Sequence, residues 1–162
     1  MTNEEKYQEY MIMSRTIEEG VVNEMPDFER MTSKQKIKKL SRYLTSYTES
    51  QRSANTYAAR EKKNPKWKKD RELAEYLELL TATRIKMGIQ RLSDEELDMY
   101  VADLSSKLSD AIAETDVNKK FKKHDVIIAG CQLCNVDNAD IMQSVADIKS
   151  KCVEMLKDIR SM

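Results

Sequence analysis

Hydrophobic residues recur every three or four positions along most of this chain, which is the spacing of amphipathic α-helices. The first helix is expected to begin at Thr2, because Thr2 and Glu5 have the spacing of a capping box. We expect Gly20 and Pro26 to end it, since both residues disfavour a helix interior. Its apolar stripe contains Tyr7, Tyr10, Met11, Ser14, Ile17 and Val21.

A long helix is predicted over residues 33–63, where no Gly or Pro interrupts the pattern. Placing successive residues 100° apart gives this helix an apolar face and a basic face nearly opposite it. Polar residues interrupt the apolar face, and they either fix the register of a partner helix or mark where the seam reaches water. The first alternative predicts an oligomer seam consisting of Leu40, Leu44, Tyr47, Gln51 and Asn55.

The third predicted helix follows the Asn64-Pro65 pair, which combines a favoured N-cap with a residue tolerated at the first helical position. It is apolar on two sides, so we expect it to be central in the fold. The main stripe contains Leu73, Tyr76, Leu77, Leu80 and Met87. The second stripe contains Trp67, Ala82, Ile85 and Ile89.

Three further helices complete the prediction. One begins after Ser93, which opens a second capping box, and the others are expected from Asn118 to Cys134 and from Asp137 to the end. Only 3 Gly and 2 Pro occur, so tight turns and hairpins have few of the residues they need. The sequence therefore predicts an all-α protein of five to six amphipathic helices, forming a bundle or an elongated helical array. We expect one domain over 1–162, with a subdivision near residue 92 as the alternative, into 1–91 and 92–162.

Charge is strongly segregated although the chain has no net charge. Residues 34–71 hold 13 Lys and Arg against 3 acids, whereas residues 92–118 hold 8 acids and one Lys. The positive electrostatic field of residues 34–71 must meet an anionic surface, either on a partner or within this fold. The predicted anion- or partner-binding residues are Lys34, Lys38, Arg42, Arg60, Lys62, Lys63, Lys66, Trp67, Lys68, Lys69 and Arg71. The competing interpretation is that the acids of residues 94–116, or those of the first thirty residues, fold over this block and neutralise it.

The only His and all three Cys fall in one stretch, as His124, Cys131, Cys134 and Cys152. Four such ligands would suit tetrahedral zinc. Only one Cys-x-x-Cys pair is present, however, and it lies in an apolar run, which favours buried cysteines instead. We therefore expect no metal and no cofactor, and redox use of the pair is the remaining alternative.

No phosphate loop or catalytic triad is evident, so we do not expect an enzyme or a small-molecule substrate. We expect a non-catalytic helical interaction protein, such as an adaptor, assembly or inhibitor-like protein, that binds a protein partner or itself through the 34–71 surface and heptad-like seams. One alternative is a nucleic-acid-binding protein that grips phosphates with the same block. Another is a small structural or accessory protein of a virus or mobile element. The acidic start lacks an apolar leader and no apolar run could span a bilayer, so we expect a cytoplasmic protein without a membrane contact.

Overall fold

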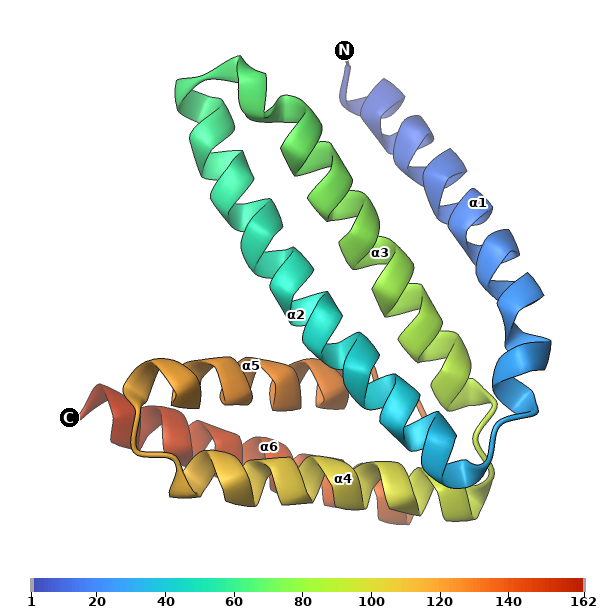
Figure 1. Ribbon diagram of the computed structural model, residues 1–162, viewed down its shortest axis with the longest axis vertical. Coiled ribbons are helices and arrows are strands. Elements are labelled where there is room, and N and C mark those ends of the chain that lie inside the picture. The colour runs from blue at the N-terminus through green and yellow to red at the C-terminus, as the bar shows by residue number, and fades with distance from the viewer. Residues whose placement is uncertain (1, 162) are drawn as a thin grey trace.

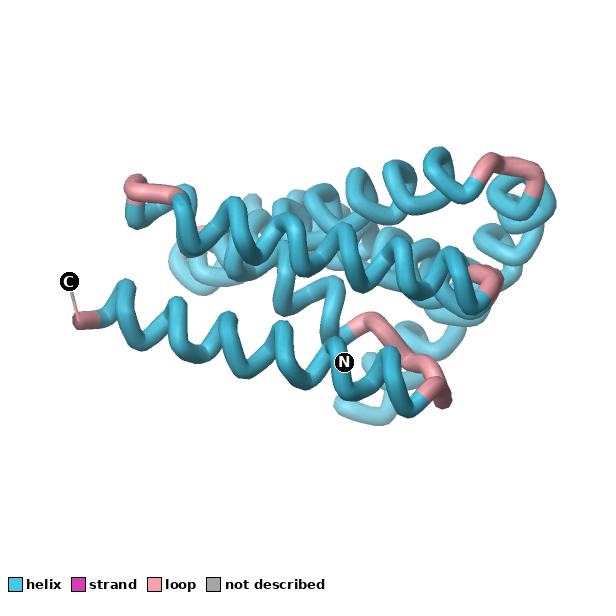
Figure 2. Tube along the Cα trace, turned by 90° about the horizontal axis from the view of Figure 1, so that it is seen from below, coloured by secondary structure: helices cyan, strands magenta, loops and turns pink. Residues whose placement is uncertain are grey.

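The computed structural model describes residues 2–161, and these are 89% helical without a strand. This confirms the predicted all-α class. Figure 1 shows the six α-helices, and Figure 2 shows the short loops that join them. A 3₁₀ turn, Pro65–Trp67, separates the second helix from the third. The helices are α1 (Asn3–Glu29), α2 (Ser33–Lys63), α3 (Lys68–Gln90), α4 (Asp94–Ala113), α5 (Val117–Gln132) and α6 (Ala139–Arg160).

The helices form two groups that cross each other (Figure 1). Helices α1, α2 and α3 lie side by side as a long arm, and α4, α5 and α6 form a base across one end of it. Both the start of α1 and the turn between α2 and α3 lie at the other end of the arm, far from the base (Figure 1). We call this the distal end.

Most helix starts follow the predicted caps. Complete capping boxes are present at Thr2, Thr32 and Ser93, and the Asn64 side chain accepts the Lys66 backbone N–H at the 3₁₀ turn. The prediction for the end of α1 is wrong, because the helix continues through Gly20 and Pro26 to Glu29. Burial of Met25 and Phe28 in the core outweighs the hydrogen bond that Pro26 cannot make near the helix end.

Two other boundaries also differ by a residue or two. Helix α5 is capped by Asp116, which accepts the Lys119 N–H, rather than by Asn118, and it ends at Gln132. Helix α6 is capped by Asn138 rather than Asp137. Each of these helix starts has two nearby residues with capping side chains, and loop geometry decides between them.

The predicted seam of α2 lies inside this chain's own core. Leu40 and Leu44 are fully buried among the other helices, so they have no free surface for a second chain. Tyr47 and Gln51 are half-buried and hydrogen-bonded to each other at 3.0 Å, and Asn55 is exposed. The prediction that Leu40 and Leu44 contact a second chain is therefore wrong, because α4, α5 and the other arm helices cover both side chains.

Only one of the two apolar stripes of α3 lies in the core, although both were expected to be covered. The second stripe is the buried one, with Ala82, Ile85 and Ile89 in the core. The main stripe reaches solvent in the distal half of the helix, where Leu73 is 58%, Tyr76 40% and Leu77 41% exposed. We call these three residues the α3 outer stripe, and within residues 2–161 they stay partly exposed to solvent.

Arm and base meet at two kinds of contact. The first is close helix packing at Gly130 of α5, where an added Cβ would lie 2.6 Å from Leu104 of α4 and 3.2 Å from Leu44 of α2. The absence of a side chain lets three helices approach one another. Tyr100 donates its hydroxyl to the Gly130 carbonyl at 3.1 Å and ties α4 to the same point of α5.

The second contact is a buried polar cluster at the corner between α2 and α4. The Glu96 carboxylate accepts hydrogen bonds from the Ser93 N–H at 3.0 Å, the Ser33 hydroxyl at 2.8 Å and the Lys36 Nζ at 3.3 Å. The side chains of Lys36 and Glu96 are 11% and 8% exposed. The Ser93 amide, followed by Ser33 and Lys36, lowers the pKa of Glu96 to about 2 despite its burial.

Replacing Gly130 with Ala should destabilise the protein, because Leu104 and Leu44 are fully buried and cannot retreat from a methyl group. We expect a loss of about 1–3 kcal/mol in the free energy of unfolding. Gly20 provides the matched control, since it is also helical but has nothing within 4 Å of its added Cβ. Gly20→Ala should raise stability by up to about 1 kcal/mol. Urea unfolding of both variants measures the difference, and equal effects would contradict the packing described.

Acid should remove the contribution of the Glu96 cluster. The pKa of Glu96 is lower in the folded chain than its ordinary 4.5, so its stabilisation is present above that pH and is lost as the pH falls toward about 2. Glu96→Gln should flatten this part of the stability profile. At neutral pH it should cost about 3–5 kcal/mol, because Lys36 stays buried without a counter-charge. Glu95→Gln, at an exposed neighbouring position, should change stability by less than about 0.5 kcal/mol. Thermal melts from pH 7 to pH 2 test both expectations, and a Glu96→Gln profile that matches the wild type would contradict them.

Candidate functional site

The basic residues singled out in the sequence lie in two separate places. Lys34, Lys38 and Arg42 are exposed near the start of α2, beside the base. The others lie at or next to the distal turn. Lys34 and Lys62 are roughly 40 Å apart along α2, at about 1.5 Å per residue. The structure therefore does not bring the predicted residues together into one binding surface.

The patch beside the base lies next to acidic residues of α4. Lys34 and Lys38 line a shallow surface hollow together with Asp103, and the first turn of α4 holds three acids. This half of the block agrees with the interpretation that the chain's own acids neutralise it. The distal half does not, because screening at physiological salt limits the effect of the α4 acids to roughly 8 Å. Among the described residues, its ion pairs are only with acids of the hairpin itself, which are Glu61, Glu72 and Glu75.

The distal half of the block is a cluster of lysines around the α2–α3 turn, which we call the distal lysine cluster. All five side chains are exposed, and the only acid of residues 2–161 within ion-pair distance of any of them is Glu72, 3.9 Å from Lys68. Lys66, Lys68 and Lys69 lie at or just before the start of α3. The dipole of this helix already makes its start positive, so these three charges are electrostatically unfavourable there. The cluster consists of Lys62, Lys63, Lys66, Lys68 and Lys69.

Arg71 has a structural role in this turn. Its guanidinium forms ion pairs with Glu61 across the turn and with Glu75 one helical turn further along α3, the latter at 2.9 Å. The Glu61 carboxylate raises the pKa of Arg71, chiefly through a hydrogen bond. Arg71 and Glu61 are three-quarters buried, so this pair closes the hairpin and leaves no free charge for a partner. The sequence suggested no link between them, because the contact depends on the turn geometry.

Trp67 also packs within the turn. Its ring stacks on Tyr57 with centroids 5.7 Å apart and planes inclined by 14°. The Arg60 guanidinium lies 4.8 Å from the Trp67 ring centroid and Lys66 Nζ lies 5.3 Å from it. Cation–π contacts of this kind hold the side chains of the turn in place. The indole thus already has neighbours and is not an open stacking platform.

The α3 outer stripe adjoins the distal lysine cluster on the same helix. Leu73, Tyr76 and Leu77 follow Lys69 at positions three and four apart, so they form one face of the helix. Exposed apolar residues bordered by charges are typical of a protein interface. This surface was not predicted from the sequence, because both apolar stripes of α3 were expected to lie in the core. The signal available was the lysine cluster one turn earlier on the same helix.

The proposed zinc ligands are not brought together. No group of three or more His, Cys, Asp or Glu side chains within residues 2–161 could hold a metal ion. Burial raises the pKa of Cys131 to about 12 and that of Cys152 to about 11, and it also raises the pKa of Cys134. These thiols are therefore protonated at neutral pH, and they pack as small apolar side chains.

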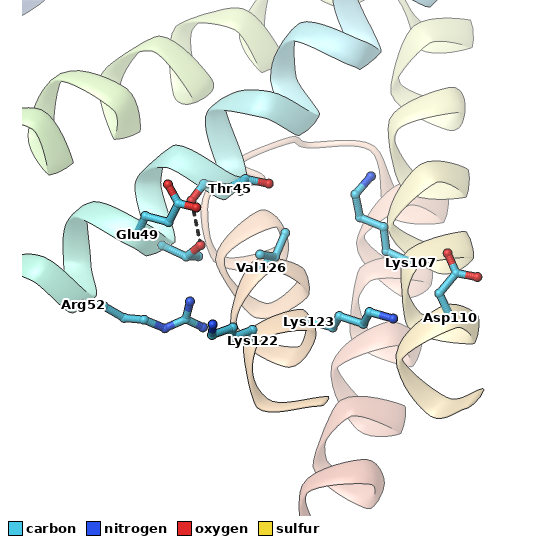
Figure 3. A pocket seen from close by; sticks show the side chains of 9 residues that line it. Thr45, Glu49, Arg52, Lys107, Asp110, Lys122, Lys123 and Val126 are labelled. Carbon is cyan, nitrogen blue, oxygen red and sulfur yellow. Dashed lines mark hydrogen bonds between the residues drawn. The ribbon is translucent and has the colours of Figure 1, made fainter. Parts of the chain in front are cut away.

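A cleft of about 270 Å³ lies between α2, α4 and α5 (Figure 3). Most of the cationic side chains that line this cleft form ion pairs within the chain. Arg52 pairs with Asp125 at 2.8 Å, Lys123 pairs with Glu114 at 2.8 Å, and Lys107 pairs with Asp103. The Lys123 ammonium and the Asp116 N–H lower the pKa of Glu114 to about 2. Lys122 is the lining cation without such a partner, so the cleft lacks the excess charge of the distal end.

Comparison with known proteins gave no match, either to protein-family models, to curated proteins or to solved structures. None of the helices described over residues 2–161 is long and apolar enough to cross a membrane. The geometry of the chain is thus the only guide to its function.

Proposed function

We propose that this protein is a non-catalytic interaction protein that binds an acidic helix of a protein partner at the distal end of its arm. The observation that carries this proposal is the juxtaposition of exposed lysines around the α2–α3 turn with the exposed apolar stripe that follows them on α3. The lysines would attract and orient the acidic partner, and the outer stripe would supply the apolar area that gives affinity. The long α2–α3 hairpin would hold this surface away from the base.

Two features favour a protein partner over nucleic acid. The aromatic groups of the turn are packed against each other, whereas single-stranded nucleic acid needs open rings on which bases stack. Leu73 and Leu77 are each more than two-fifths exposed directly beside the lysines, and a phosphate backbone would leave them uncovered.

The non-catalytic character rests on the state of the possible nucleophiles. All three thiols are buried and protonated, as their raised pKa values indicate, and they face core residues. The hydroxyl of Tyr100 is also fully buried, and it donates a hydrogen bond to the backbone. Such groups contribute to packing, and neither a substrate nor a base reaches them.

Removal of the unmatched charges should abolish binding without harming the fold. We expect the variant Lys62→Gln, Lys63→Gln, Lys66→Gln, Lys69→Gln to keep a melting temperature close to that of the wild type, because relief of repulsion at the start of α3 offsets the loss of the favourable charges of Lys62 and Lys63 at the end of α2. Its affinity for a designed amphipathic peptide, with Glu on one face and Leu on the other, should fall roughly tenfold or more at low salt. Titration monitored by the fluorescence of Trp67, the only Trp, measures this affinity.

Arg71→Gln is the matched control, because it removes a cation of the same turn that is already paired. It should lower stability by up to about 1 kcal/mol and leave most of the affinity for the peptide. If the lysine variant bound the peptide as well as the wild type, the proposal would be wrong. If duplex DNA bound more tightly, with a steep log–log salt dependence and no effect of Leu77→Ser, the nucleic-acid alternative would replace it.

A further inference from the structure

The start of α1 has the properties required of the partner helix. Residues 2–10 are all exposed, and they include three acids, Glu4, Glu5 and Glu9, against the single base Lys6. Tyr7 and Tyr10 continue the stripe that is buried further along α1 at Ile17 and Val21, yet they are 60% and 50% exposed. This segment is an acidic amphipathic helix whose two tyrosines keep half or more of their surface exposed.

Helix α1 packs fully on the arm only in its second half. There, Glu24 forms a bidentate pair with Arg84 of α3 at 2.7 and 2.9 Å, and Glu29 pairs with Arg91 at 3.1 Å. Nearer its start, Tyr10 and Met13 line an open hollow of about 370 Å³ together with Glu75 and Leu79 of α3. The core contacts between the two helices thus end before the distal end is reached.

The two unpartnered surfaces are complementary in both charge and apolarity. The start of α1 is acidic and carries exposed tyrosines, whereas the α2–α3 turn is basic and is followed by the α3 outer stripe. No ion pair joins Glu4, Glu5 or Glu9 to the distal lysine cluster among the described residues. Because both surfaces lie at the distal end (Figure 1), a second copy can offer each of them to the other.

We propose that two copies of this chain associate at their distal ends, with the start of α1 of each copy seated on the α3 outer stripe and distal lysine cluster of the other. A two-fold axis along the helices satisfies this arrangement, since α1 and α3 run in the same direction (Figure 1). The contact places Glu4 and Glu9 against lysines and the two tyrosines against Leu73 and Leu77. Zero net charge leaves no long-range repulsion between the copies.

This inference rests on the proposed function, because it names the acidic helix that the distal end receives. It also gives a role to the exposed apolar residues of α1 and α3, whereas the seam hypothesis used residues of α2. The surface used lies on α1 and α3, and it leaves the core contacts of Leu40 and Leu44 unchanged.

Charge reversal provides a test specific to this pairing. One variant carries Glu4→Lys and Glu9→Lys on α1, and a second carries Lys62→Glu, Lys66→Glu and Lys69→Glu at the turn. Glu5 is left in place because it completes the Thr2 capping box. Each variant alone should be monomeric, since like charges would meet at both contacts. An equimolar mixture should form a heterodimer, because both contacts then join opposite charges. Sedimentation velocity at low salt measures the masses.

Substitution of exposed apolar residues provides a second test. Leu77→Ser should weaken the wild-type dimer at least tenfold, whereas Ile12→Ser should not. Ile12 is 65% exposed on α1 but lies off the Tyr7–Tyr10 face, so it is a matched control. A wild-type protein that stays monomeric up to about 1 mM, where a contact of only about 4 kcal/mol is half-formed, would overturn this inference. A charge-reversed mixture that stays monomeric would overturn it as well.

The two proposals fail separately. The α1 variant keeps its lysines, so it should still bind the designed acidic peptide as a monomer. If the wild type binds the peptide but never dimerises, the second-copy inference is wrong and the proposed function stands. If the wild type forms a dimer that the Leu77→Ser and charge-reversed variants do not disrupt, the assignment of its interface is wrong.

Discussion

The buried contact between Glu96 and Lys36 fixes where the arm begins on the base, and the apolar packing at Gly130 completes the junction. The Glu96 carboxylate completes the capping box that begins α4. It also accepts hydrogen bonds from the side chains of Ser33 and Lys36 at the start of α2. A group with two such roles must stay charged, since its hydrogen-bond donors stabilise the ionised form. Its burial is tolerated because every oxygen has a partner, whereas removal of either charge would leave the other unpaired in the core. The arm therefore starts at a defined point and in a defined direction on the base.

This corner also explains why the charge of the chain is separated in space. With α2 fixed to α4 at its start, its length carries the α2–α3 turn roughly 40 Å from the acidic helix. The acids of α4 can lower the potential around Lys34 and Lys38, but not that around Lys62 or Lys69. The α2–α3 turn thus keeps an excess of exposed positive charge in a chain whose total charge is zero. An acidic partner, including the start of α1 of a second copy, is the simplest match to that charge.

Helix number and most helix starts could be predicted from the sequence, because capping boxes and 3.6-residue periodicity are local properties. The exceptions have tertiary causes. Pro26 does not end α1 because Phe28 is buried just beyond it, and Gly20 lies in a helix because nothing there requires a turn. Periodicity could not tell which stripe of α3 faces the core, since both are apolar and only the packing of neighbouring helices decides. The lysines of the site were predictable from charge density. The role of Arg71 was not, because Glu61 reaches it only across a folded turn.

We propose the distal end of the arm as the surface that binds an acidic helix, which is the start of α1 of a second copy. Hydrogen exchange, measured at low and high protein concentration and read by segment, tests it most directly. We expect protection from exchange to rise with protein concentration in residues 3–13 and 66–77 and to stay constant in α4, α5 and α6. Exchange that is the same at all concentrations, or protection that appears only in the base, would contradict it.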